Sequence, residues 1–187
     1  MTAPLRLGIL LSGSGRTLQN LIDRIADGRL HCAVACVISD RTGVKGLERA
    51  QRNGLPSYVE KDSERIFATL RQHAVDLVCL CGYLRLLRIE DDFEGRVLNI
   101  HPALLPKFGG KGFYGERVHR AVLEAGDTES GCTVHLCNND YDQGRILLQR
   151  PVAVSPDDDV DSLAARVFAA ECDAYPAAIE LWLEESR

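Results

Sequence analysis

The chain has 187 residues, of which 45% are hydrophobic and 26% charged, with a formal net charge of -5 at pH 7. This length predicts one domain, and the composition is typical of a globular rather than a disordered protein. The negative charge argues against non-specific binding to nucleic acid, and no apolar run reaches the roughly 20 residues that span a bilayer. The first residues lead into a strand pattern without a cleavable apolar stretch, so we expect a cytoplasmic protein.

The seven cysteines form no C-x-x-C pair, and their number is odd. Neither a disulfide framework nor a zinc ribbon fits this pattern. Most of them lie in or beside apolar runs, where a free cysteine behaves as a small buried hydrophobe. A metal site built from His101, His135 and Asp142 lacks the usual ligand spacing, so we predict no metal.

The first half of the chain alternates short apolar runs with segments whose hydrophobic residues recur at helical spacing. We predict strands at residues 5–11, 32–38, 56–59 and 76–81, and helices at residues 18–28, 46–53 and around 66–73. Strands that alternate with helices pair in parallel through right-handed crossovers. The sequence therefore predicts a doubly wound, mostly parallel, Rossmann-like α/β sheet.

The second half of the chain is less regular. A predicted strand at residues 96–100 precedes a long loop, residues 102–115, which contains four glycines and two prolines. Long loops in compact domains are usually functional or mobile. Beyond this loop we predict a helix, an antiparallel strand pair and a long C-terminal helix, at residues 116–124, 132–137 with 146–154, and 159–184. Pro176 is expected to kink or restart the last helix.

A glycine-rich turn, Ser-Gly-Ser-Gly-Arg-Thr at residues 12–17, lies between the first predicted strand and helix. Backbone N–H groups and the macrodipole at a helix N-terminus favour bound anions. The turn lacks the third glycine of a dinucleotide fingerprint and the Gly-Lys-Ser/Thr of a P-loop. We therefore expect a single phosphate monoester to bind here, at Gly13, Gly15, Arg16 and Thr17. The alternative is that the glycines serve only a sharp turn.

A second candidate site combines Asn99, His101 and Asp142. Side chains alternate along a strand, so Asn99 and His101 share a face. An amide donor, an imidazole and a carboxylate that holds the imidazole suit a reaction that passes through an oxyanion. We expect Asp142 to raise the pKa of His101 from about 6.5 and keep it cationic near neutral pH. His135 either lines this pocket or belongs to the core.

Four stretches of the sequence resemble the folate-dependent phosphoribosylglycinamide formyltransferases: residues 12–19, 82–87, 99–106 and 141–144. Their order and spacing fit over nearly the whole chain. The Asn-x-His-Pro…Leu-Leu-Pro run is shared with formyl-folate hydrolases and methionyl-tRNA formyltransferase, so by itself it identifies only the superfamily. Those relatives carry an added N-terminal or C-terminal domain, and we expect neither within this length.

The resemblance implies one formyltransferase domain over residues 1–187 and a role in purine biosynthesis. The formyl group of 10-formyltetrahydrofolate would pass to the amine of 5'-phosphoribosylglycinamide, which attacks directly to form a tetrahedral oxyanion. Asn99, His101 and Asp142 would be catalytic, and the glycine-rich turn would hold the substrate phosphate. The remaining residues implied are Glu171 on the amine side, His135 as pocket support, and Arg85, Leu86, Leu87, Asn139, Asp140 and Tyr141 around the folate. We expect a monomer or a homodimer, and small-molecule substrates only.

The sequence departs from the family pattern at three places. It has Arg16-Thr17 where many members have Ser-Asn, a longer segment at residues 107–115, and no extension after the last helix. Two other functions stay open from the sequence. One is a transferase that formylates another amine, such as an amino sugar, and the other is a non-catalytic module that binds a ribotide or a folate.

Overall fold

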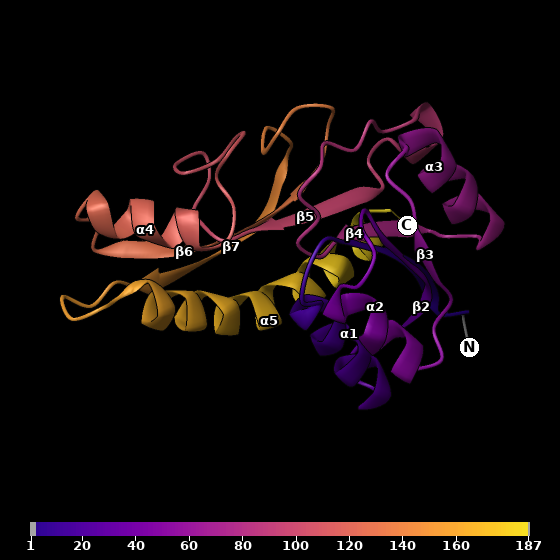
Figure 1. Ribbon diagram of the computed structural model, residues 1–187, viewed down its shortest axis with the longest axis horizontal. Helices are drawn as coiled ribbons and strands as arrows, with labels where there is room; N and C mark the ends of the chain where they lie inside the picture. Colours follow the sequence, from indigo (N-terminus) through magenta and orange to yellow (C-terminus); the bar gives the residue numbers. More distant parts are fainter. Residues whose placement is uncertain (1–2, 187) are drawn as a thin grey trace. The chain divides into compact units, whose positions relative to one another are not determined.

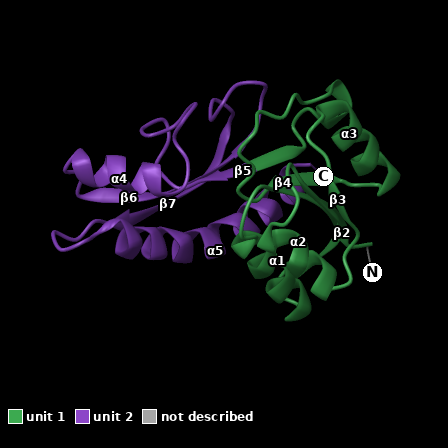
Figure 2. Ribbon diagram, viewed as in Figure 1, with its two compact units in different colours: residues 1–98 green, residues 99–187 purple. Residues whose placement is uncertain are grey.

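The computed structural model describes residues 3–186, and the chain divides into two compact units, Met1–Leu98 and Asn99–Arg187 (Figure 2). Seven strands follow the order β3-β2-β1-β4-β5-β6-β7 in one sheet (Figure 1). Strand β5, Val97–His101, contains the boundary between the units. The predicted α/β class is confirmed, whereas the single domain stays a prediction.

The first unit is a parallel sheet built from alternating strands and helices. Strand β1 pairs in parallel with β2 and β4, and β2 pairs in parallel with β3. All of β4, and all of β1 except Arg6, is buried, as expected for central strands covered on both faces. The elements are β1 Leu5–Leu11, α1 Arg16–Ala26, β2 Cys32–Ser39, α2 Lys45–Arg52, β3 Ser57–Val59, α3 Ser63–Gln72, β4 Leu77–Leu80 and the 3-10 turn Asp91–Phe93.

The second unit contains the predicted antiparallel pair, β6 Glu129–Leu136 and β7 Ile146–Ala153, together with α4 Glu116–Glu124. Strand β6 begins earlier than the predicted start at residue 132. The sequence Glu-Ser-Gly gives no apolar pattern there, but backbone pairing of Glu129 and Ser130 with β7 extends the strand. Gly131 fits this pairing because a Cβ at its position would lie 2.2 Å from the carbonyl oxygen of Arg150.

Helix α5, Val160–Glu185, packs along β6 and β7 (Figure 1). Its start is fixed by a capping box, in which Ser162 N donates to Asp159 Oδ1 at 2.8 Å and Asp159 N donates to Ser162 Oγ at 3.0 Å. The helix continues through Pro176 and does not restart there, so of the two expected alternatives only a kink stays a prediction. Burial of Pro176 and of the residues around it stabilises the turn that lacks one hydrogen bond. None of the helices within residues 3–186 is long and apolar enough to cross a membrane.

The glycine-rich turn of the first unit packs backbone to backbone against α2. Gly15 begins α1 with a φ of 69°, and a Cβ at this position would lie 2.6 Å from the Cα of Gly46. Gly46 N donates to the carbonyl oxygen of Gly13 at 3.0 Å. This close approach explains why Gly15 is glycine without reference to a ligand.

We expect Gly15→Ala to destabilise the protein more than Gly28→Ala, as measured by urea unfolding. Both positions have a left-handed backbone, with φ of 69° and 72°, which costs about 1–2 kcal/mol for a residue with a Cβ. A Cβ at Gly28 meets nothing within 4 Å, whereas one at Gly15 adds an overpacking cost of about 1–3 kcal/mol. Equal losses of unfolding free energy would contradict the close approach to Gly46.

Candidate functional site

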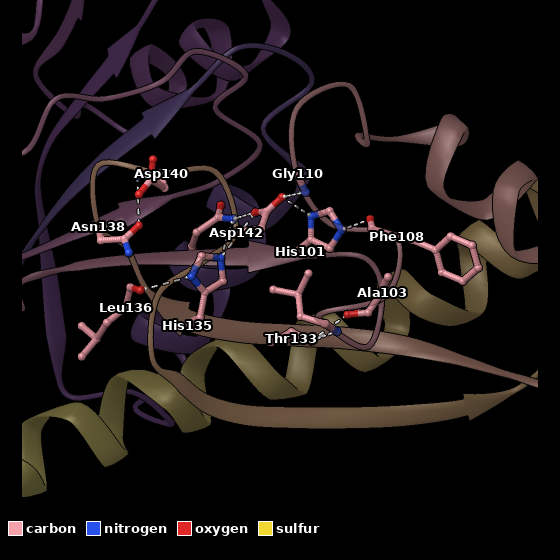
Figure 3. Close-up of polar contacts among 12 residues, drawn as sticks. His101, Ala103, Phe108, Gly110, Thr133, His135, Leu136, Asn138, Asp140 and Asp142 are labelled. Carbon is pink, nitrogen blue, oxygen red and sulfur yellow. Dashed lines mark hydrogen bonds and ion pairs between the residues drawn. The ribbon is translucent and has the colours of Figure 1, made fainter.

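Four polar side chains converge in the second unit, around the carboxylate of Asp142 (Figure 3). Asn99 and His101 come from β5, His135 from β6, and Asp142 from the turn between β6 and β7. Asp142 Oδ2 lies 3.6 Å from His101 Nδ1, and Oδ1 lies 3.5 Å from His135 Nε2. Asn99 Nδ2 lies 3.4 Å from Asp142 Oδ1 and 3.1 Å from His135 Nε2. The side chains of His101, His135 and Asp142 are only 5%, 2% and 10% exposed.

The turn that carries Asp142 is shaped by its backbone. Leu136 N donates to the carbonyl oxygen of Arg145 at 2.8 Å and closes the base of the turn. Gly144 is required there, because a Cβ would lie 1.5 Å from the carbonyl oxygen of Leu136. Asp142 itself has a φ of 55°, in the left-handed region that aspartate adopts more readily than most residues. The sequence Tyr-Asp-Gln-Gly thus directs the carboxylate toward β5 and β6.

The long loop after β5 contacts this cluster at two points (Figure 3). His101 Nε2 lies 2.8 Å from the carbonyl oxygen of Phe108, and Gly110 N donates to Asp142 Oδ2 at 2.8 Å. A carbonyl oxygen only accepts hydrogen bonds, so Nε2 of His101 carries the proton. The loop backbone therefore accepts the hydrogen bond of His101 Nε2 through Phe108 and donates one to Asp142 Oδ2 through Gly110.

Burial controls the charge of His101. It lowers the pKa of this imidazole, and the charge of His135 acts in the same direction, while Asp142 and the Phe108 carbonyl oppose them. The net direction is downward from the ordinary value of 6.5, so the expectation of a raised pKa is wrong. Asp142 contributes in the predicted direction, but the loss of solvation outweighs it.

Asp142 has a pKa below its ordinary value of 3.8 and is therefore ionised at neutral pH. Burial alone would raise the pKa of this carboxyl group. The hydrogen bond with His135, the charge of His101 and the N–H of Gly110 together lower it by more. The arrangement is thus a buried carboxylate with two imidazoles and an amide around it.

The predicted phosphate residues lie in the first unit, at the start of α1. Gly15 is the N-cap residue, and Arg16 and Thr17 are the first two residues of the helix. A Cβ on Gly13 would meet nothing within 4 Å, so the backbone of Gly13 faces open space. Of the two glycines, Gly13 is the one whose surroundings suit close approach of a ligand.

Hydrogen bonds within the first unit join this turn to the segment predicted to bind folate. Ser12 N donates to the carbonyl oxygen of Gly82 at 3.0 Å, and Leu84 N donates to Ser12 Oγ at 3.0 Å. Arg85 and Leu86 are exposed there, whereas the side chain of Leu87 is buried in the core of the unit. A role of Leu87 in folate binding would therefore fall to its backbone.

Sequence reasoning missed Asp40, which directly follows β2 beside this turn. Its side chain is 4% exposed and pairs with Arg41, with an Nη2–Oδ2 distance of 3.2 Å. Burial would raise the pKa of Asp40, but hydrogen bonds from Arg41 and Ser12 and the charge of Arg85 hold it below the ordinary value. Its position after a buried strand, at the carboxyl end of a parallel sheet, was the available signal.

The other predicted residues of the second unit lie on two elements. Asn139, Asp140 and Tyr141 share the turn of Asp142, with the first two exposed. Glu171 lies on α5, near Cys132 of β6. The burial of Cys132 raises the pKa of its thiol to about 12, and the negative charge of Glu171 is the second cause. Among residues 3–186 no group of three His, Cys, Asp or Glu side chains is arranged to hold a metal ion.

Comparison with known proteins gives consistent matches. The model of the family described as Formyl transferase matches residues 5–179. The chain is 37% identical to phosphoribosylglycinamide formyltransferase of Haemophilus influenzae, over 97% of this chain and 88% of that protein. It is 42% identical to the trifunctional purine biosynthetic protein adenosine-3 of Drosophila melanogaster, over 94% of this chain but 14% of that longer protein. The crystal structure of glycinamide ribonucleotide transformylase 1 from Symbiobacterium toebii superposes with a TM-score of 0.90 at 40% identity, covering 99% of this chain and 90% of that one.

We expect an NMR titration of the ligand-free protein to show His101 protonating below pH 6.5, because burial disfavours the imidazolium. Asp142→Asn should lower the midpoint further, since it removes the charge that favours protonation. An unchanged or higher midpoint in this variant would contradict the ion pair.

The same shift makes stability depend on pH. Since the folded-state pKa of His101 lies below the ordinary 6.5, the unfolded state binds more protons between the two values. The contribution to stability is therefore present above pH 6.5 and is lost as the pH falls through the folded-state pKa. Urea unfolding across this pH range, with a His101→Gln variant as control, measures this contribution of His101 to the free energy of unfolding.

Proposed function

The chain belongs to the formyl transferase family, and on that premise we propose that it transfers the formyl group of 10-formyltetrahydrofolate to the amine of 5'-phosphoribosylglycinamide. The acceptor is supported by the Haemophilus and Symbiobacterium proteins, whose names specify it. The observation that carries the proposal is the cluster that Asn99, His101 and Asp142 form in the second unit.

The reaction creates negative charge on one oxygen atom. The substrate amine attacks the formyl carbon, a C–N bond forms, and the carbonyl electron pair moves onto the formyl oxygen. Collapse of this tetrahedral intermediate breaks the bond to the folate nitrogen, which takes up a proton as the new amide nitrogen loses one. Asn99 Nδ2 and His101 Nε2 are the N–H donors that would stabilise the oxyanion.

Both donors have partners in the ligand-free protein. His101 Nε2 donates to the carbonyl of Phe108, and Asn99 Nδ2 faces His135 and Asp142. The formyl oxygen would replace the Phe108 carbonyl as the acceptor for His101. An oxyanion is a stronger acceptor than a neutral carbonyl, so this exchange favours the transition state over the ground state.

The charge of His101 would change during the reaction. Burial favours its neutral form in the free protein, but a developing oxyanion next to Nε2 favours the imidazolium. Asp142, which faces Nδ1, would stabilise this cation and help to move the proton between the two nitrogens of the reaction, through water. The site would thus stabilise charge mainly when the charge forms.

The other site residues keep their predicted roles within this proposal. The ribotide phosphate would bind at the start of α1, where open space over Gly13 supports close approach. Glu171 would contact the amine side of the substrate. Residues 85–87 and 139–141 stay the predicted folate residues, and of these Arg85, Leu86, Asn139 and Asp140 have exposed side chains. A single domain, a cytoplasmic location and a monomeric or dimeric state remain predictions.

A steady-state assay tests the proposed function. The purified protein is incubated with 10-formyltetrahydrofolate alone, with phosphoribosylglycinamide, or with an amino sugar, and folate consumption is followed. Turnover that requires the ribotide supports formyl transfer to this acceptor. Equal consumption without it would mean hydrolysis, turnover only with an amino sugar would mean another acceptor, and no consumption would leave a binding protein.

We expect Asn99→Ala and His101→Ala to reduce turnover by about 10²- to 10³-fold, the usual cost of removing an oxyanion donor. Asp142→Asn should also reduce turnover by orders of magnitude while the melting temperature changes little. The matched control is Asp157→Asn, which makes the same chemical change at an exposed aspartate. Near-native turnover of a folded Asp142→Asn protein would remove Asp142 from the mechanism.

A further inference from the structure

We propose that Gln149 and Thr133 are positioning residues, which hold the segment between His101 and Phe108 in the geometry that formyl transfer requires. This inference rests on the proposed function. Neither side chain belongs to the cluster around Asp142. Both lie on the β6–β7 pair, where Thr133 and Gln149 are direct cross-strand partners.

Three hydrogen bonds connect these two side chains to the segment, and a fourth joins the two side chains to each other. The Thr133 hydroxyl donates to the carbonyl oxygen of Ala103 at 2.7 Å and accepts from Leu105 N at 3.0 Å. Gln149 Nε2 donates to the carbonyl oxygen of Leu105 at 3.0 Å and to Thr133 Oγ1 at 2.9 Å. We call this set of bonds the 103–105 clamp.

Every donor in the clamp has an acceptor. Thr133 Oγ1 accepts two hydrogen bonds, so its single proton is available for Ala103. Gln149 uses both of its N–H groups, and the carbonyl of Leu105 fixes which end of the amide faces the segment. Such a directional network specifies one position of the backbone, which apolar side chains in the same place could not do.

The clamped segment leads directly to the reacting group. His101 lies just before it and Phe108 just after it, and these two residues meet through the 2.8 Å contact between Nε2 and the carbonyl oxygen. Thr133 and His135 are two residues apart on β6, so their side chains project from the same face of the strand. One strand face therefore holds both the loop after His101 and the carboxylate beside it.

The test compares Gln149→Leu, Thr133→Val and Thr133→Ser with the wild-type protein. We expect kcat to fall about 10- to 100-fold in Gln149→Leu and Thr133→Val, with little change in KM for either substrate, because small displacements of a catalytic group act on the chemical step. Thr133→Ser keeps the hydroxyl and should restore most of the rate. Val167→Ala is the control, a buried α5 substitution that lowers stability but makes none of the four bonds.

A second measurement does not depend on turnover. The Nε2 proton of His101 is observed by NMR, and its exchange with water should become at least about 10-fold faster in Gln149→Leu, as the Phe108 carbonyl is released. Loss of activity no greater than in Val167→Ala, or unchanged exchange, would overturn the role of the clamp. Absence of transfer by the wild-type protein would reject the proposed function instead, and the exchange rates would still decide the clamp.

Discussion

The buried carboxylate of Asp142 is the constraint on which the site depends. Removing such a charge from water is costly unless hydrogen bonds and opposite charges compensate for it. Here the compensation comes from three directions: the backbone N–H of Gly110, the amide of Asn99 and the imidazoles of His101 and His135. Each of these groups is therefore held in place by the same carboxylate that it stabilises.

The position of the carboxylate in turn depends on the backbone of two loops. Gly144 allows the turn after β6 to close, and the left-handed conformation of Asp142 directs its side chain inward. The loop after β5 completes the site from the other side, through Gly110 and the carbonyl of Phe108. Burial lowers the pKa of His101 by more than Asp142 raises it, and a new negative charge near Nε2 would reverse this net direction.

Much of this arrangement follows from local sequence patterns. The apolar runs predict the parallel sheet, and strand alternation alone places Asn99 and His101 on one face. The distant Asp-Gln-Gly turn makes Asp142 a candidate partner for the amide and the imidazole, and its catalytic role is what the resemblance implies.

The features that were missed depend on long-range contacts. The direction of the His101 pKa is a sum of burial and charge, and burial cannot be measured from spacing. Asp40 and Gln149 acquire their partners from segments far away in the chain, Ser12 and Leu105. The early start of β6 and the continuity of α5 through Pro176 come from pairing and packing that override local preference.

The most direct test of the account is a crystal structure of the protein with a folate analogue that carries a hydrated carbonyl at the transfer position. The account predicts that one hydroxyl of this group lies within hydrogen-bond distance of His101 Nε2 and Asn99 Nδ2, with the Phe108 carbonyl displaced from His101. A complex in which His101 Nε2 still donates its hydrogen bond to the Phe108 carbonyl, and in which the hydrated carbon lies away from His101 and Asn99, would contradict the account.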